Sequence, residues 1–422
     1  MKTAQSRNIA ESFVQPRVIY VVTSSLGVRF LRGQLGYLRK VGFDVIVISS
    51  PGEELTCIGK SEGVQVIPLA MRREISPLRD LISLCHLWVI MRRLRPSLTN
   101  VGTPKAGLLG GLAAFLAGVP CRLYTLYGLR LETSSGMQRR LLLFAERLSC
   151  LCAHRVICVS DSLRQKAVAL GLVKCEQTAI FGSGSCNGVD VSRFELDQEG
   201  YPRVYELRRK LGIPEEAPVV GFVGRFTRDK GIVELVKAFS QLCETSSVVW
   251  LLLVGDFEDG DPLPPDIRRA IETNPKIIRT GWVPEATLYY HLMDVLALPT
   301  YREGFPNVVL EAHAAGKPVI ATRATGVVDA MVDGVTGIMV PVGDVAALAK
   351  GLESLLGNKG SAAAMGGAGR ERVQREFQQE KIWGALAQEY SQLLRARGLP
   401  PPKVETKRVA SAATEGPSVV QS

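Results

Sequence analysis

The stretch VLALPTYREGFPNVVLEAHAAG, residues 295–316, joins a short apolar strand, a polar loop and the start of a helix. Residues 295–298 have strand composition. Pro306 suits the first turn of a helix, where the backbone N–H that proline lacks would be unpaired in any case. Gly316 and Pro318 are expected to end this helix. The segment has the form of an active-site loop.

The start of this helix is a candidate binding site for an anion. Unpaired backbone N–H groups and the positive end of the helix dipole both face whatever lies in front of a helix N-terminus. Gly304, Phe305 and Pro306 lead into the helix, and Asn307 follows them. A diphosphate would fit there.

Two glutamates, Glu303 and Glu311, are separated by about two helical turns, which places their carboxylates on the order of 12 Å apart along the axis. A retaining glycosidase needs a pair only about 5 Å apart. We therefore expect them to contact different parts of one ligand: Glu303 the reacting sugar, and Glu311 a ribose diol. Taken alone, the pair is explained equally well as two solvated charges at a helix end.

A second segment, GRFTRDKG at residues 224–231, follows an apolar strand candidate and precedes a helix-like run. Arg225 offers a rigid fork of donors and Lys230 a point charge, which suits them to hold phosphate oxygens while charge develops on a leaving group. A solvated basic turn is the alternative, and Arg228 and Asp229 are the residues that fit that role best.

Together, GRFTRDKG (224–231) and EGFPNVVLE (303–311) resemble the paired signature of retaining family-4 glycosyltransferases with the GT-B fold, whose two glutamates are spaced E-x7-E. The likeness extends from residue 18 to residue 390 and includes LLLVGDFE (251–258), TGWV (280–283) and GKPVIATRATGVVDAMVDGVTGIMVPVGD (316–344). Upstream, TPKAGLLGGLAA (103–114), YTLYGLRLE (124–132) and GSGSCNGVD (182–190) resemble the subgroup that builds capsular and exopolysaccharide repeat units on lipid carriers.

The resemblance implies an α/β protein of two doubly wound Rossmann-like domains that face each other across a cleft, and strands and helices alternate as this requires. We expect an acceptor-binding domain over residues 17–200, a nucleotide-sugar domain over 201–380 and a helix over 381–397 that packs back on the first domain. Residues 1–16 are expected to be a polar lead-in and residues 398–422 a disordered tail. Residues 370–397 have the pattern of one long helix.

The resemblance also implies a chemistry. It is same-face transfer without a metal, in which a donor phosphate oxygen takes the acceptor proton. Arg225 and Lys230 would stabilise the departing diphosphate, and Glu303 would lie at the sugar. A sugar-nucleotide epimerase of the same architecture, which needs no acceptor, is one alternative, and a catalytically silent partner subunit is another.

The nucleotide-sugar site is expected in loops at the carboxyl ends of strands, where ligands collect in such sheets. Its candidate residues are Gly27, Gly224, Arg225, Lys230, Gly255, Trp282, Val283, Glu303, Gly304, Phe305, Pro306, Asn307 and Glu311. Trp282 and Val283 would flank a nucleobase, although packing explains Trp282 equally well. Relatives carry a Gly-Gly pair in the first loop, where this chain has only Gly27.

The acceptor is expected to contact the first domain. Candidate residues are Ser24, Ser25, Lys105, Tyr127 and Arg130. Relatives often have histidine where Tyr127 stands. Simple exposure at the surface accounts for Lys105 equally well. For Arg130 and the neighbouring Glu132, exposed surface charge is the better explanation.

Charge is distributed unevenly along the 422 residues. Residues 1–190 carry a net +12 (24 Lys+Arg against 12 Asp+Glu), and residues 191–422 carry −2 (27 against 29). Such asymmetry indicates nucleic acid, an anionic membrane surface or an anionic substrate. Aromatic residues make up only 6% of the chain and are not interleaved with the basic ones. We therefore expect no nucleic acid, and a polyprenyl-diphosphate-linked acceptor fits better. The resemblance implies a UDP-type sugar donor.

Apolar patterning gives no membrane span, because no run reaches the roughly 18 residues that a bilayer requires. Residues 1–12 lack the apolar core of a signal peptide, so we expect a cytoplasmic protein, with peripheral contact at the inner membrane face as a further option.

A helix over residues 75–94 carries an apolar stripe of Leu78, Leu81, Ile82, Cys85, Trp88 and Val89. We interpret the stripe as core, with a membrane interface as the alternative.

Metal and cofactor sites are not indicated. The nine cysteines and four histidines have no zinc-site spacing. Asp259-Gly260-Asp261 spells D-x-D but lies in a proline-rich loop, and two loop carboxylates are too few ligands for Mg²⁺.

Overall fold

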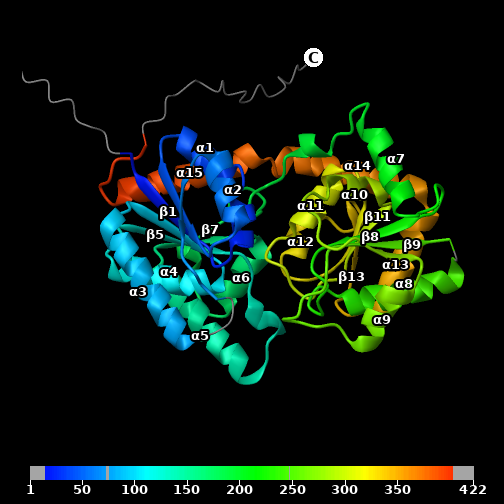
Figure 1. Cartoon of the computed structure of the whole chain (residues 1–422), viewed down its shortest axis with the longest axis horizontal. Coiled ribbons are helices and arrows are strands. Elements are labelled where there is room, and N and C mark those ends of the chain that lie inside the picture. The colour runs from blue at the N-terminus through cyan, green and yellow to red at the C-terminus, as the bar shows by residue number, and fades with distance from the viewer. Residues whose placement is uncertain (1–14, 73–75, 247, 403–422) are drawn as a thin grey trace, which may run out of the picture.

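The computed structural model describes residues 15–72, 76–246 and 248–402 and shows two α/β domains side by side (Figure 1). Each contains one parallel sheet covered by helices, as the GT-B architecture requires. Nearly all of the expected lead-in and most of the expected tail lie outside the described residues. None of the helices in the described ranges combines the length and apolar character that a bilayer crossing needs.

The first domain contains a seven-stranded parallel sheet in the order β3-β2-β1-β4-β5-β6-β7. Its strands are β1 (Arg17–Val21), β2 (Asp44–Ser49), β3 (Gln65–Pro68), β4 (Leu98–Gly102), β5 (Cys121–Leu126), β6 (Arg155–Cys158) and β7 (Thr178–Ala179). Its helices are η1 (Ser25–Leu31), α1 (Gln34–Lys40), α2 (Glu53–Glu62), α3 (Pro77–Leu94), α4 (Pro104–Leu116), η2 (Arg130–Thr133), α5 (Gly136–Cys152), α6 (Asp161–Ala169) and η3 (Cys175–Gln177). In the central strands, β1 pairs with both β2 and β4, so that Val18 lies between Val45 and Leu98.

The second domain contains a six-stranded parallel sheet in the order β10-β9-β8-β11-β12-β13. Its strands are β8 (Val219–Val223), β9 (Trp250–Val254), β10 (Ile277–Arg279), β11 (Val295–Leu298), β12 (Val319–Thr322) and β13 (Gly337–Val340). The segment between the two sheets contains η4 (Val191–Phe194) and α7 (Gly200–Lys210). The remaining helices are α8 (Ile232–Thr245), α9 (Pro265–Thr273), α10 (Thr287–Leu292), α11 (Asn307–Ala314), α12 (Val327–Ala330), α13 (Val345–Gly357), α14 (Lys359–Glu376) and α15 (Gln379–Ala396). The helix expected at Pro306 begins one residue later, with Pro306 as its N-cap.

The C-terminal segment forms two helices, so the interpretation of residues 370–397 as one long helix is wrong. Phe377 leaves the helical path because its ring is fully buried, and its carbonyl accepts a hydrogen bond from the Val189 backbone N–H (2.9 Å). Beyond this break, α15 crosses to the first domain, as Figure 1 shows. There the Tyr390 hydroxyl lies 2.6 Å from that of Tyr20 and accepts from Asn100 (2.7 Å).

The apolar stripe of α3 is not core, which corrects that interpretation. Leu78 is 81% exposed, and Leu81, Ile82 and Trp88 are exposed as well. The helix turns a narrower face inward, formed by Ser83, Leu87 and Met91. That face packs on the glycine- and alanine-rich α4, and the apolar residues on the opposite side of α3 remain exposed.

One carboxyl group, Glu146, is buried in the first domain and accepts a hydrogen bond from the Tyr124 hydroxyl (2.6 Å). Burial raises the pKa of Glu146 from 4.5 to about 7, since its charged form loses solvation, and the bond from Tyr124 opposes this only in part. Between these values the native protein holds a proton that the unfolded chain has released. Stability should therefore fall as pH rises through this window.

We expect Glu146→Gln to reduce this pH dependence, because the amide is neutral at every pH and still offers Tyr124 an acceptor. In the wild type, the free energy of unfolding should fall by on the order of 3 kcal/mol across this pH window, the value expected for a pKa shift of this size. Urea unfolding midpoints of the wild type and the variant, measured at mildly acidic and mildly alkaline pH, test this prediction. An equal loss in both proteins would show that Glu146 is not the titrating group.

Candidate active site

The carboxyl ends of the strands in the second domain face the first domain. Gly224 follows β8, Gly255 follows β9, Trp282 lies just beyond β10, and Glu303 lies in the loop after β11. The Ser160 hydroxyl of the first domain donates to the Gly304 carbonyl (2.7 Å). The expected nucleotide-sugar loops therefore lie where the two domains meet.

Lys230 and Glu303 form an ion pair at this junction, with 2.5 Å between Nζ and Oε1. Both side chains are less than one-fifth exposed (18% and 14%). The next residue, Gly231, has φ +72°, and a Cβ there would lie 1.9 Å from the Pro299 carbonyl oxygen. Only glycine lets α8 begin this close to the end of β11. The Asp229 carbonyl, which accepts from the Tyr301 N–H (2.9 Å), ties the two loops together.

Asp229 is not a solvated turn residue, and that part of the sequence interpretation is wrong. Its carboxylate accepts from the Thr227 hydroxyl (2.6 Å) and from Arg302 (2.8 Å). Burial by itself would raise the pKa of Asp229, but the bond from Thr227 and the charges of Arg302 and Lys230 bring it below 3.8. Asp229 thus stays ionised and holds Arg302, whose Nε donates to Thr133 of the first domain (2.9 Å). Sequence reasoning missed Arg302, and its position beside Glu303 was the available signal.

Arg225 lies at the mouth of the cleft, half exposed, in an ion pair with Glu258. It lines an open cavity of about 940 Å³ shared by both domains. Arg130 and Gln138 of the first domain line the same cavity, together with Arg302. A candidate donor contact and a candidate acceptor contact therefore share one space.

Helix α11 places Glu311 on its second turn, where the half-buried carboxylate accepts from the Tyr290 hydroxyl (2.5 Å). Burial raises the pKa of Glu311, and Tyr290 and Arg193 oppose this increase. In the first turn, the Asn307 Oδ1 is buried and has no hydrogen-bond partner among the described residues. Phe305 is buried, with its ring centroid 5.5 Å from that of Phe377, so its side chain packs inward.

Tyr127 approaches α11 from the first domain. A Cβ on Gly304 would lie 1.9 Å from the Tyr127 carbonyl oxygen, so the two backbones nearly touch. The Tyr127 ring stacks on Phe30 with 5.8 Å between centroids, and burial raises the pKa of its hydroxyl. Arg130 begins η2 on the same loop and is exposed.

The loop after β1 holds the remaining candidates of the first domain. The Ser24 hydroxyl accepts from the Leu26 N–H (3.3 Å), and thereby caps η1. Ser25 packs against Gly52. A Cβ at Gly27 would meet only the Val22 side chain, at 3.8 Å, so packing within the protein does not require glycine there.

Lys105 forms an ion pair with Asp80 (2.8 Å) that joins α4 to α3.

Trp282 is 59% exposed, and the Arg29 guanidinium carbon lies 4.8 Å from its ring centroid, across the domain junction. Val283 is half-buried against the core. An exposed Trp282 ring at this junction is accessible to a planar ligand.

A second group of contacts between the domains was not found from the sequence. The Asp329 carboxylate accepts from the Ser162 N–H (3.2 Å), and Glu132 accepts from the Thr325 hydroxyl (2.7 Å). Lys166 bonds the same Glu132 carboxylate oxygen (2.5 Å). From the sequence alone, these residues are indistinguishable from helix caps and surface charges, so their contacts between the domains could not be predicted.

Metal-binding clusters of three or more histidine, cysteine or acidic side chains do not occur among the described residues. In the D-x-D triplet, an Asp261 carboxylate oxygen accepts from the Asp229 N–H (3.1 Å), which gives Asp261 a role in holding the loop.

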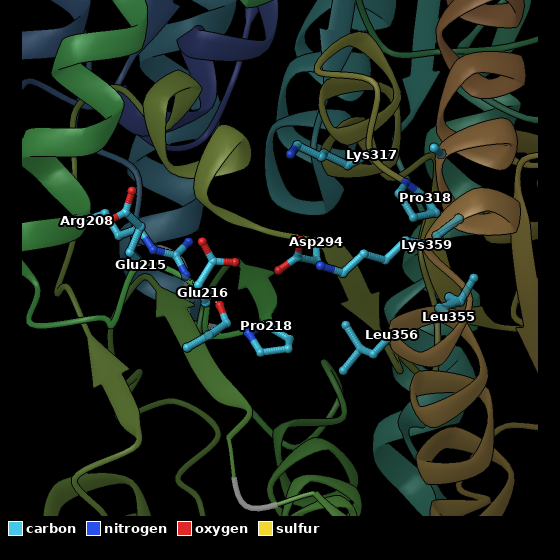
Figure 2. A pocket seen from close by; sticks show the side chains of 13 residues that line it. Arg208, Glu215, Glu216, Pro218, Asp294, Lys317, Pro318, Leu355, Leu356 and Lys359 are labelled. Atoms are coloured by element: carbon cyan, nitrogen blue, oxygen red, sulfur yellow. Dashed lines mark hydrogen bonds between the residues drawn. The ribbon is translucent and has the colours of Figure 1, made fainter.

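A smaller cavity, of about 280 Å³, lies at the opposite ends of the strands of the second domain (Figure 2). Arg208, Asp294 and Lys317 line it, with none of the candidate site residues. Lys317 donates to the His291 carbonyl (3.2 Å), and Asp294 accepts from the Val219 N–H (2.7 Å). These charged groups thus hold neighbouring segments together.

Two family descriptions match the chain. Residues 27–184 match "Glycosyl transferase 4-like domain", and residues 204–372 match "Glycosyl transferases group 1". The capsular polysaccharide biosynthesis glycosyltransferase CapM of Staphylococcus aureus is 36% identical over 379 residues, which span 90% of this chain and 98% of that protein. The UDP-Gal:alpha-D-GlcNAc-diphosphoundecaprenol alpha-1,3-galactosyltransferase of Escherichia coli is 26% identical over 260 residues, 60% of this chain and 65% of that protein.

Solved structures share the fold. Anabaena Alr3699/HepE in complex with UDP and glucose superposes with a TM-score of 0.75 at 20% identity, covering 89% of this chain and all of that one. WaaG, a glycosyltransferase involved in lipopolysaccharide biosynthesis, gives a TM-score of 0.69 at 14% identity, covering 89% of this chain and 99% of that one.

Proposed function

This chain belongs to the GT-B glycosyltransferases of the capsular polysaccharide type, and we propose that it moves a hexose or N-acetylhexosamine from a UDP-sugar to a saccharide on a polyprenyl diphosphate. The observation that carries the proposal is the Lys230–Glu303 pair beside the start of α11, between the two domains. It sets a cation and the N-terminus of α11 beside a carboxylate, which suits a sugar diphosphate.

In the proposed reaction, the acceptor hydroxyl oxygen forms a bond to the anomeric carbon as the bond from that carbon to the UDP oxygen breaks. The acceptor attacks the same face of the sugar from which UDP departs, so the anomeric configuration is retained, and its proton passes to a donor phosphate oxygen on that face. Lys230 and Arg225 stabilise the charge that develops on the leaving diphosphate, and these cations make a metal unnecessary. Glu303 contacts the sugar, and Glu311 accepts hydrogen bonds from the ribose diol.

The proposed donor follows from the relatives that carry UDP or use UDP-galactose, and the acceptor from the relative that acts on a diphosphoundecaprenol saccharide. The net +12 of residues 1–190 supports an anionic acceptor held mainly by the first domain. Arg130 and Tyr127 are proposed as its contacts, since both lie on the loop that meets Gly304.

A panel of labelled UDP-sugars, each with and without polyprenyl-diphosphate saccharides, tests this function. We expect one acceptor to gain the mass of one sugar residue, with activity unchanged in EDTA and NMR showing the retained anomer. Conversion of the UDP-sugar to an isomer without acceptor would instead indicate an epimerase. Absence of turnover across the whole panel would favour a silent subunit.

A further inference from the structure

We propose that the outer surface of α3 and α5 docks the first domain on an anionic lipid membrane, and that α5 leads the lipid-linked acceptor from the bilayer to the cleft. The second half of this inference rests on the proposed function, because only a lipid-linked acceptor needs such a path. We call this surface the α3–α5 face. It consists of the exposed apolar and basic residues of these two helices.

On α3 the apolar part of the face is Leu78, Leu81, Ile82 and Trp88, which recur at helical spacing on the side turned away from the sheet. The described residues place no other element of the chain over them. Leu78 is the most exposed of the four. A continuous exposed stripe of this kind on a globular protein marks an interaction surface.

On α5 the apolar part is Met137, Leu141, Phe144 and Leu151, again at helical spacing, with Phe144 66% and Leu151 70% exposed. α4 packs between α3 and α5, so both helices cover the same side of the sheet. The two stripes therefore belong to one side of the domain.

The charge of the face determines the kind of partner. Arg79, Arg92 and Arg93 on α3 are exposed, as are Arg139, Arg140 and Arg147 on α5. Within α3, α4 and α5, all fully described, the only carboxylates are Asp80 and Glu146. Asp80 is paired with Lys105, and Glu146 is buried.

Arginines around exposed leucine, phenylalanine and tryptophan are the composition of a surface that lies in the headgroup region of an anionic membrane. A second copy of this chain would fit poorly, since pairing two such faces would set arginine against arginine.

The position of α5 connects the face with the cleft. Its first turn carries Gln138, which lines the shared cavity together with Arg130. Met137 and Leu141, which flank Gln138, belong to the exposed stripe. The acceptor thus places its diphosphate near Arg130 while its hydrocarbon chain follows α5 into the bilayer.

Sedimentation of the full chain with vesicles tests the docking. We expect binding to vesicles that contain phosphatidylglycerol, weaker binding at high salt because of screening, and little binding to pure phosphatidylcholine. The double variant Leu81→Glu/Phe144→Glu should lower partitioning about tenfold or more, since it replaces buried apolar area with charge that anionic lipid repels. Tyr205→Glu, on the exposed side of α7 in the second domain, is the matched control and should bind like wild type.

The double variant should keep its melting temperature and its activity on a short-chain, water-soluble acceptor, but lose activity on the full-length acceptor in vesicles. Equal vesicle binding by wild type and the double variant would overturn the proposal, as would equal binding to neutral vesicles. A wild-type dimer that the variant breaks, seen by light scattering, would assign the face to a second copy instead. Vesicle binding needs no sugar transfer, so the docking and the proposed function can fail separately.

Discussion

Replacing Lys230 by alanine is expected to lower turnover by about 10²- to 10³-fold, the scale for losing one partner of a charge that develops in the transition state. The Lys230 ammonium lies 2.5 Å from the Glu303 carboxylate, and the close approach of Gly231 to Pro299 fixes the backbone next to Lys230. Its loss removes the proposed stabilisation of the leaving diphosphate. It also leaves the Glu303 carboxylate without its cation.

Steady-state kinetics with saturating donor and acceptor measure the effect of Lys230→Ala. Lys237→Ala is the matched control, because Lys237 is exposed on the same helix, α8. Combining Lys230→Ala with Glu303→Gln shows whether the loss comes from the unpaired carboxylate, in which case the second change would recover activity. Near-normal turnover of Lys230→Ala would remove Lys230 from the proposed mechanism.

The second large effect is expected for Gly304→Ala, at the contact between the domains. The new Cβ would lie 1.9 Å from the Tyr127 carbonyl oxygen and 3.0 Å from the Gly128 nitrogen. Both neighbours are backbone atoms, which cannot rotate away as a side chain could. The domains must therefore separate slightly, which would weaken the Ser160 bond to the Gly304 carbonyl. A misplacement of about 1 Å can cost about 10²-fold in kcat/KM, and we expect a loss of that order.

Kinetics of Gly304→Ala should be paired with small-angle scattering, which would show a more open molecule with unchanged secondary structure. Gly367→Ala is the control, since a Cβ there would have no described neighbour within 4 Å and α14 would accept it. Full activity of Gly304→Ala would mean that the closed contact at Gly304 is not needed for the reaction.

Much of the architecture could be predicted from local patterns. Apolar runs that alternate with helical segments indicate parallel sheets, because strands buried on both faces must be apolar throughout. The spacing of Lys230 and Glu303 from their strands likewise placed both at the carboxyl ends of the second sheet. Their pairing in the structure agrees with a shared site, and their catalytic roles stay predictions.

Other features depend on neighbours that are distant in sequence. An apolar stripe such as that of Leu78 and Trp88 is the same in a core helix and in a surface helix, so only the packing of α3 on α4 shows that it is exposed. Asp229 has the composition of a solvated turn, and its role depends on Arg302, 73 residues away. Phe377 breaks a helical pattern because a tertiary pocket holds its ring.

The sequence by itself therefore determined the two parallel sheets and the loops that carry the candidate residues, because strand and helix periodicity and turn chemistry act over a few residues. Its motifs also identified the family of the chain. Only the tertiary structure decided which side of a helix meets solvent, how closely Gly304 approaches Tyr127 and which polar groups form hydrogen bonds between the domains. These outcomes are set by packing and electrostatic contacts between segments far apart in the chain, for which no local pattern carries a signal.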